Sequence, residues 1–134
     1  MAENKVEFEL VSPEKLLVSK DADMVVVPGV EGDFGVLPRH APMISTVRPG
    51  VISIYEGKTV IERIFVAGGV AEVTPTRCTV LAEQALPVSD IDPAAAKQSL
   101  QDAREDLADA KTDSERKAAE RQIAVNTAMI QAIA

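Results

Sequence analysis

The stretch IDPAAA, residues 91–96, decides the fold of this 134-residue chain, because the amino-acid composition changes there. All seven glycines lie before residue 70, and all eight prolines lie before residue 94. The residues that follow are rich in alanine with Glu, Asp, Lys, Arg and Gln, most of which favour helix. Since turn-forming residues stop where helix formers begin, the sequence predicts two domains, at residues 1–88 and 89–134.

Short β-strands are expected throughout the first domain. Val6, Phe8 and Leu10 alternate with charged residues, which is typical of a strand with one buried face. The same alternation, rich in Val, Ile and Thr, predicts further strands at 15–19, 23–27, 42–47, 51–55, 58–66, 70–74 and 76–82. The Glu56-Gly57-Lys58 sequence predicts a hairpin between two of them. Many short strands with regular turns indicate a β-sandwich or barrel.

Two helices are expected in the second domain. Asp92 is a good N-cap, and Pro93 suits the first helical position, where its missing N–H costs nothing. In a helix of about 93–111, apolar residues form a narrow stripe that faces a partner helix. The stripe consists of Ala96, Leu100, Ala103, Leu107 and Ala110. The TDSE sequence at 112–115 resembles a capping box, so a second helix from about residue 114 is expected to run antiparallel to the first.

The second helix changes along its length. Its basic residues Arg116, Lys117 and Arg121 lie in the first turns, whereas residues 122–134 carry no charge. The apolar side chains of this uncharged half cover a wider face than one narrow helix can bury. We expect this half to pack on the strand domain of the same polypeptide, with another protein as the alternative.

Charge and composition exclude several classes of partner. The formal net charge is −7, from 14 basic and 21 acidic residues, which disfavours nucleic acid. The sequence has no signal-peptide pattern and no run of about 18 apolar residues, so we expect a soluble protein without direct lipid insertion. Aromatic residues make up only 3%, so aliphatic side chains must fill the core.

Residues suited to catalysis or metal binding are scarce. His40 is the only histidine, and no serine or cysteine stands in a nucleophile motif, so neither a catalytic triad nor a metal site is expected. Cys78, the only cysteine, shares a strand face with Val80 and Ala82, which predicts a buried core residue. We interpret His40 as a hydrogen-bonded surface or interface residue. The sequence therefore predicts a non-catalytic protein without a cofactor or metal.

The glycine-rich segment PGVEGDFGVLP, residues 28–38, does not have the properties of a phosphate-binding loop. It lacks a Gly-Lys-Ser/Thr ending, its acidic side chains repel phosphate, and a strand pattern follows it. We expect its glycines, at positions 29, 32 and 35, to allow positive φ in turns and bulges. The loop then presents Glu31, Asp33 and Phe34 at the rim of the sandwich.

A known family shares these motifs. Residues 28–42, PGVEGDFGVLPRHAP, with the Arg48-Pro49-Gly50 sequence, closely resemble the N-terminal signature of F-type ATP synthase epsilon subunits. The segments GGVAEV at 68–73 and VLAEQA at 80–85 are similar to a second block of that family. The change to a helical hairpin near residue 90 matches the family's plan, so the resemblance covers nearly the whole sequence.

This resemblance implies a non-catalytic rotor subunit of the proton-translocating ATP synthase. It implies a ten-stranded sandwich that is clamped to the γ subunit and rests on the c-ring, peripheral to the cytoplasmic face of the bacterial inner membrane. The loop of Glu31, Gly32, Asp33 and Phe34 is then expected to face the c-ring, and the stretch around His40 is expected to face γ.

The resemblance also implies a regulatory role for the hairpin. This sequence departs from the family's motif there, which weakens that implication. ATP-binding members begin helix one with an Ile/Leu-Asp-x-x-Arg-Ala motif. Ile91 and Asp92 match it, but Ala95 occupies the arginine position, so we expect no ATP binding. Arg116, Lys117 and Arg121 are candidates for contact with the α/β catalytic head. The alternative to the rotor function is an independent β-sandwich adaptor that dimerises through its hairpin.

Overall fold

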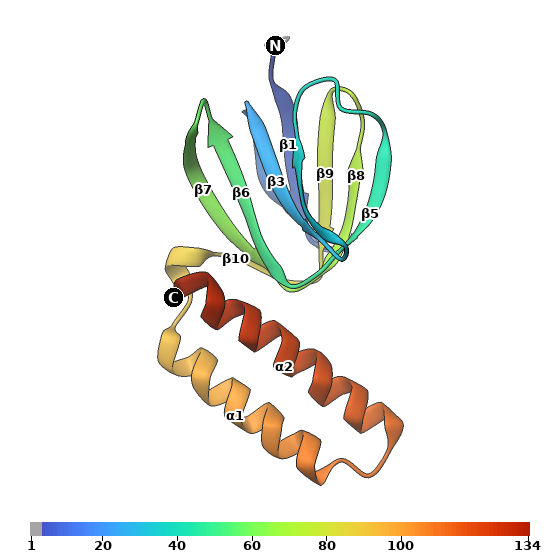
Figure 1. Ribbon diagram of the computed structural model, residues 1–134, viewed down its shortest axis with the longest axis vertical. Coiled ribbons are helices and arrows are strands. Elements are labelled where there is room, and N and C mark those ends of the chain that lie inside the picture. Colours follow the sequence, from blue (N-terminus) through green and yellow to red (C-terminus); the bar gives the residue numbers. More distant parts are fainter. Residues whose placement is uncertain (1–3) are drawn as a thin grey trace. The chain divides into compact units, whose positions relative to one another are not determined.

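The computed structural model describes residues 4–134, which divide into two compact units between Pro87 and Val88. We call them the strand domain, residues 4–87, and the helical hairpin, residues 88–134 (Figure 1). The predicted fold class, a β-sandwich followed by an antiparallel α-helical hairpin, is confirmed.

Ten strands build the strand domain. They are β1 (Val6–Val11), β2 (Leu16–Ala22), β3 (Met24–Gly29), β4 (Gly32–Val36), β5 (Met43–Val47), β6 (Gly50–Glu56), β7 (Thr59–Val66), β8 (Gly69–Val73), β9 (Arg77–Ala82) and β10 (Ala85–Pro87). In the described residues, neighbouring strands are antiparallel except for β1 and β9, which run parallel.

The sheet forms two layers because its halves meet at one corner. There β3 pairs with β5 only at Gly29 and Val47. One layer has the order β10-β7-β6-β3, with β4 also paired to β3, and the other has the order β5-β8-β9-β1-β2. The core between the layers holds fully buried aliphatic and aromatic side chains. They include Phe8, Leu10, Val25, Val27, Ile52, Ile54, Val73 and Val80.

A seam between β2 and β7 brings the two layers together away from that corner. Across it, Lys20 Nζ lies 2.5 Å from Glu62 Oε1. Beside the ion pair is a small pocket whose lining is mostly apolar and includes Leu10, Leu17 and Ile64. The layers are therefore tied both at the corner and at the seam.

The eight strands predicted from alternation are present. Val6, Phe8 and Leu10 are buried as their period-two spacing required, and Cys78, Val80 and Ala82 share a buried face. The Glu56–Thr59 pair closes a two-residue hairpin loop, in which Gly57 has φ of 61°. A glycine tolerates that φ without strain.

Two strands were missed by the alternation pattern. The glycine-rich segment, expected to be a loop, contains β4, which pairs with β3 through five residue pairs. Its sequence, GDFGV, has too few large apolar residues to show a period of two. The other missed strand, β10, has only three residues and a proline at its end.

The hairpin begins with a short 3₁₀ turn, Val88–Asp90, followed by α1 (Pro93–Asp109) and α2 (Asp113–Ile133). The Asp92 carboxylate caps α1 by accepting hydrogen bonds from the backbone N–H groups of Ala94 and Ala95, at 3.0 and 3.3 Å. The Thr112 hydroxyl accepts from the Glu115 N–H at 3.1 Å, as the capping pattern predicted. Both predicted helices are therefore present with their expected caps.

Small side chains dominate the buried positions of the hairpin. Ala96 and Ala103 of the predicted stripe are buried in α1, and Leu100 and Leu107 are half-buried. In α2 the buried positions are Ala119, Val125 and Asn126. The side-chain nitrogen of Asn126 has no hydrogen-bond partner among the described residues. None of the described helices is long and apolar enough to span a membrane.

Candidate functional site

The tip of the β3–β4 hairpin contains most of the acidic loop predicted from sequence. Val30 and Glu31 form a two-residue turn, because Gly29 pairs with Gly32 across it. Both turn residues are exposed, and Gly32 has φ of 135°, a conformation that favours glycine. This tip therefore presents one apolar and one acidic side chain to solvent.

Two expectations about the glycine-rich segment were wrong. Phe34 is not displayed at the rim, because it is half-buried and packs against the core. Of the glycines in that segment only Gly32 has positive φ. Gly29 is required for close packing instead, since an added Cβ would lie 2.9 Å from the Gly32 carbonyl oxygen.

Arg48, which lies between β5 and β6, braces this tip. Its guanidinium donates to the Gly29 carbonyl at 2.5 Å and pairs with the Asp33 carboxylate at 2.6 Å. Its backbone N–H donates to the Pro28 carbonyl at 2.9 Å. The sequence signal was the Arg48-Pro49-Gly50 motif, but nothing in it showed which carbonyl and carboxylate the arginine would bind.

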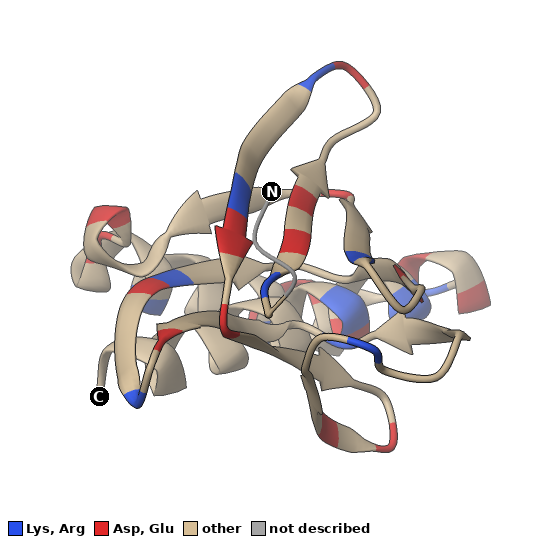
Figure 2. Ribbon diagram, turned by 90° about the horizontal axis from the view of Figure 1, so that it is seen from above, with Lys and Arg blue, Asp and Glu red and all other residues tan. Residues whose placement is uncertain are grey.

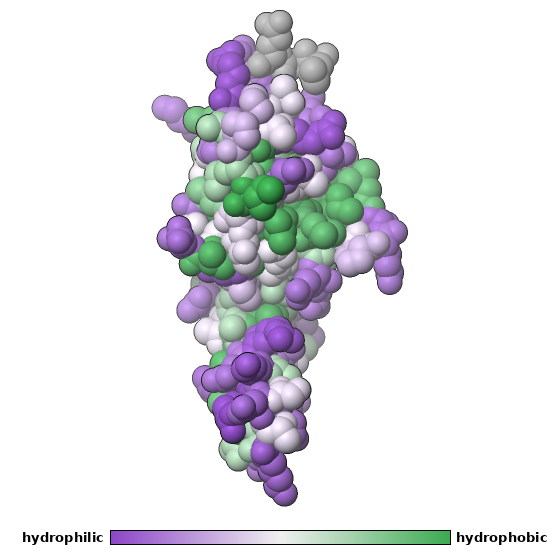
Figure 3. Space-filling model, turned by 90° about the vertical axis from the view of Figure 1, so that its right-hand side faces the viewer, coloured by the Kyte–Doolittle hydropathy of each residue, from purple (hydrophilic) through white to green (hydrophobic). Residues whose placement is uncertain are grey.

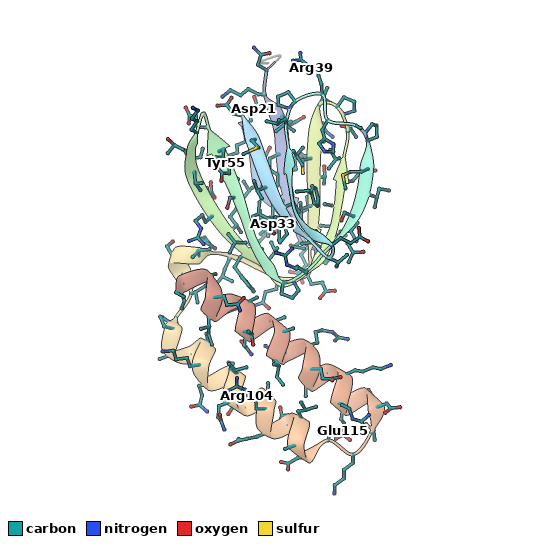
Figure 4. The ribbon with its side chains drawn as sticks, viewed as in Figure 1. Asp21, Asp33, Arg39, Tyr55, Arg104 and Glu115 are labelled. Carbon is teal, nitrogen blue, oxygen red and sulfur yellow. The ribbon has the colours of Figure 1, made fainter. Side chains whose placement is uncertain are left out.

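His40 lies in the loop between β4 and β5. Arg39, with φ of 66°, donates its backbone N–H to the Pro75 carbonyl at 2.7 Å, which fixes the loop beside the β8–β9 turn. His40 Nδ1 lies 2.6 Å from the Ala41 carbonyl oxygen and donates to it, because that oxygen can only accept. Figure 4 shows Asp33 and Arg39 at opposite ends of the strand domain.

An exposed apolar surface runs along the sheet from Ile44, near this loop, towards the corner at Val47. Ile44, Val70 and Leu81 are 73%, 45% and 48% exposed on the outer face of β5, β8 and β9. Val70 pairs directly with Leu81, and Ile44 lies one diagonal step away because it pairs with Glu72. We call these three residues the outer apolar patch. Figure 3 shows hydrophobic side chains gathered on the side of the strand domain that carries β5, where a shallow groove runs from Pro42 to Thr74.

The residues named for the hairpin are not gathered into one site. Ile91 is buried, the Asp92 carboxylate is engaged in capping α1, and Ala95 is exposed. Arg116 pairs with Asp113 of its own helix, while Lys117 and Arg121 are exposed. The aspartate that could have contacted a ligand thus has a structural role at the helix N-terminus.

Titratable groups in the described residues form no catalytic arrangement. No group of three or more metal-ligating side chains occurs among residues 4–134. Cys78 is buried, and this burial raises the pKa of its thiol to about 12, so the thiol is protonated at neutral pH. Acidic and basic positions are interspersed along the strands and turns that face the viewer in Figure 2.

One ion pair shifts the pKa values of its members. Lys5 Nζ lies 2.7 Å from Asp23 Oδ1, and Asp23 also accepts a hydrogen bond from the Gly57 N–H. The hydrogen bond from Lys5 lowers the pKa of Asp23, with a smaller contribution from Gly57. The same hydrogen bond raises the pKa of Lys5. This pair holds the start of the domain to the β6–β7 turn.

Comparison with known proteins identifies the class of this two-domain protein. Residues 5–88 match the family described as "ATP synthase, Delta/Epsilon chain, beta-sandwich domain". Residues 92–134 match the family of the C-terminal domain of the ATP synthase epsilon subunit. The two matches cover the strand domain and the helical hairpin, respectively.

Similar proteins described as ATP synthase epsilon chains match this sequence over most or all of their length. The sequence is 57% identical to the ATP synthase epsilon chain of Rhodospirillum centenum over 98% of this protein and 93% of that one. It is 56% identical to that of Paramagnetospirillum magneticum over 100% of both. The protein therefore belongs to the ATP synthase epsilon chain family.

Solved structures show the same fold at low sequence identity. A subunit of the Euglena gracilis mitochondrial ATP synthase OSCP/F1/c-ring structure has a TM-score of 0.85 and 18% identity. The match covers 98% of this protein and 82% of that subunit. A subunit of the Tetrahymena thermophila mitochondrial ATP synthase central stalk/c-ring has a TM-score of 0.69, 17% identity and full coverage of both.

Proposed function

We propose that this protein is a non-catalytic subunit of the central stalk, which couples the γ subunit to the c-ring of a proton-translocating ATP synthase. The observation that carries this proposal is the presence of two different surfaces on one braced strand domain. The acidic hairpin tip and the His40 loop lie at opposite ends of β4, which joins them through five residues. A rigid body with two such ends can hold two partners in a fixed relation.

The hairpin tip is the proposed contact with the c-ring. Glu31 and Val30 stand exposed at the turn, and Gly32 gives the backbone the geometry to turn there. A carboxylate on a fixed turn can pair with basic residues of a partner and set its orientation. Phe34 supports the tip from the core side, since it is packed against the buried cluster.

The His40 loop and the outer apolar patch together form the proposed contact with γ. Ile44 is 73% exposed next to a shallow groove. Exposed apolar residues on neighbouring strands mark protein-binding surfaces more often than isolated ones do. His40 lies a few residues along the same segment, with its ring oriented by the Ala41 carbonyl.

We place the protein on the cytoplasmic face of the bacterial inner membrane, held there by the complex. The hairpin has a weaker, regulatory role in this proposal. Arg116, Lys117 and Arg121 are its candidate contacts with the catalytic head, but Arg116 is already paired with Asp113. Ala95 supplies no cation for a phosphate group, so ATP does not bind to the hairpin.

A binding measurement with purified γ tests this proposal. Ile44→Lys places a charge in the outer apolar patch, and we expect it to weaken binding by tenfold or more, because a buried unpaired charge is costly at an interface. Ile61→Lys is the matched control, since Ile61 is 45% exposed on β7, away from the patch. Unchanged affinity in the Ile44 variant would contradict the assignment of this surface. Failure of the wild-type protein to bind γ, together with a stable dimer in light scattering, would favour the adaptor alternative.

A further inference from the structure

A pocket opens at the seam between β2 and β7, where the two layers of the strand domain come together. β2 is the last strand of its layer, and β7 pairs with β10 only from Ile64 to Val66. Among the described residues, no backbone ladder joins β2 to β7. The seam is therefore closed by side chains alone, and these leave space between them.

Apolar side chains from both layers line this pocket, which has a volume of about 250 Å³. They are Leu10, Leu17, Val18, Ile64, Ala85, Leu86 and Pro87. Leu10 and Ile64 are only 1% and 2% exposed, so the pocket reaches the core between the layers. We call it the seam pocket. Since an apolar cavity of about 150 Å³ holds one benzene molecule, the seam pocket has room for an apolar group of roughly six to ten carbon atoms.

Glu62 supplies the charge of the seam pocket. It is the one ionisable side chain among the described residues that line the pocket, and it is 30% exposed. Its Oε1 lies 2.5 Å from Lys20 Nζ, while Lys20 itself is not part of the lining. This contact engages one carboxylate oxygen and leaves Oε2 for a second donor. A ligand with an apolar body and a polar donor at one end therefore matches the pocket in both respects.

Electrostatics favours a cation as that donor. An ammonium group would meet an opposite charge at Glu62, whereas a carboxylate would be repelled by it. The formal net charge of the protein, −7, acts in the same direction. Lys20 is the one positive charge in direct contact with the Glu62 carboxylate. It would have to share this carboxylate with the ligand or give it up.

We propose that the seam pocket binds small hydrophobic amines, with the apolar body between the layers and the ammonium group at the Glu62 carboxylate. Leu10 and Ile64 form the floor that receives the apolar body. Lys20 competes with the ligand for Glu62 and thereby lowers its affinity. None of the residues proposed to contact γ or the c-ring lines this pocket, so the inference does not depend on the proposed function.

Titration of the full-length protein with octylammonium tests this site. We expect a dissociation constant of roughly 0.1–1 mM, as for a ligand of this size. Methyl NMR signals of Leu17, Val18 and Leu86 should shift during the titration. The uncharged analogue 1-octanol should bind at least roughly threefold more weakly, because it lacks the ion pair with Glu62. Absence of binding, shifts confined to other residues, or equal affinity for 1-octanol would overturn the proposal.

Two charge variants test the competition at Glu62. Glu62→Gln removes the carboxylate and should weaken octylammonium binding at least roughly threefold. Lys20→Met removes the competing cation but keeps the apolar stem, and should strengthen binding by a similar factor. The affinity for 1-octanol should change by less than about twofold in both variants. Unchanged amine binding in Glu62→Gln, or unchanged or weaker amine binding in Lys20→Met, would contradict the assigned roles.

Two further variants locate the binding. Ala85→Leu fills space in the seam pocket and should abolish binding of both ligands, so full binding in this variant would place the ligand elsewhere and refute the site. Glu72→Gln is the matched control, because it removes the same charge beside the shallow groove on β5 and β8. Octylammonium binding should be unchanged in it. A loss equal to that of Glu62→Gln would indicate general attraction to an acidic protein instead of a site. These measurements use neither γ nor the c-ring, so their failure is distinguishable from failure of the proposed function.

Discussion

The two domains of this protein differ most in what fills their interiors. The strand domain has a core of fully buried large side chains, among them Phe8, Ile52 and Ile54. The hairpin buries chiefly alanines, together with Ile91, Val125 and Asn126, whose side-chain nitrogen has no hydrogen-bond partner among the described residues. Since a buried isoleucine stabilises by about 1.5–3 kcal/mol and an alanine by far less, the strand domain is built to keep its shape and the hairpin is held together weakly.

This difference assigns unequal tasks to the domains. The surfaces proposed for binding γ and the c-ring lie on the domain with the large core, the corner at Gly29 and the Lys20–Glu62 seam. A rotor part that transmits torque must not deform, and close packing gives that property. The hairpin lacks such a core, which suits an element that moves or contributes only regulation.

The largest expected effect comes from opening a cavity in the strand domain. Ile54→Ala, at a fully buried position, should lower the free energy of unfolding by about 2–5 kcal/mol. Urea denaturation followed by circular dichroism measures it. Ile44→Ala, at a position that is 73% exposed, is the control and should change stability by less than about 0.5 kcal/mol. Similar losses in both variants would mean that the core does not dominate the stability of this domain.

In the hairpin, a single substitution is expected to raise the free energy of unfolding instead of lowering it. Asn126→Leu replaces a buried side-chain amide, whose nitrogen has no hydrogen-bond partner among the described residues, with an apolar group of similar size, and should stabilise the hairpin by about 1–3 kcal/mol. Slower amide exchange along α1 and α2 reports it. Gln122→Leu, at an exposed position of the same helix, serves as the control. A loss of protection in Asn126→Leu would show that the asparagine supports the hairpin.

The smallest expected effect on stability comes from the Lys5–Asp23 ion pair, and this effect depends on pH. Because the folded pKa of Asp23 lies below its ordinary value of 3.8, the pair stabilises the fold above that value and loses this contribution as pH falls through the folded pKa. The folded pKa of Lys5 lies above its ordinary value of 10.5, so the contribution of Lys5 to stability is lost as pH rises through that folded pKa. The Tm of Asp23→Asn should therefore fall below that of the wild type at neutral pH and converge with it in acid. A difference that is independent of pH would contradict the pairing.

The sequence predicted the architecture well because its signals are periodic. Alternation located Val6, Phe8 and Leu10 inside, and the Asp92-Pro93 and Thr112 signals located both helix starts. It did not predict β4, where Phe34 turned inward, because glycines at 32 and 35 interrupt the apolar pattern and pairing with β3 decides the conformation. The order of residues in a sequence does not show which distant residues bind each other. The contact of Arg48 with Asp33, 15 residues away, was therefore found only in the structure.

The division of labour between the domains is tested most directly by removing the hairpin. A variant that ends at Asp90 retains the strand domain, and it can be compared with the full-length protein in a reconstituted ATP synthase by measuring ATP-driven proton pumping and ATP hydrolysis together. We predict that the truncated variant restores coupled pumping to the level of the full-length protein, with little rise in hydrolysis. Loss of coupling, or a several-fold rise in hydrolysis on truncation, would show that the hairpin performs a task assigned here to the strand domain or acts as a brake on the enzyme.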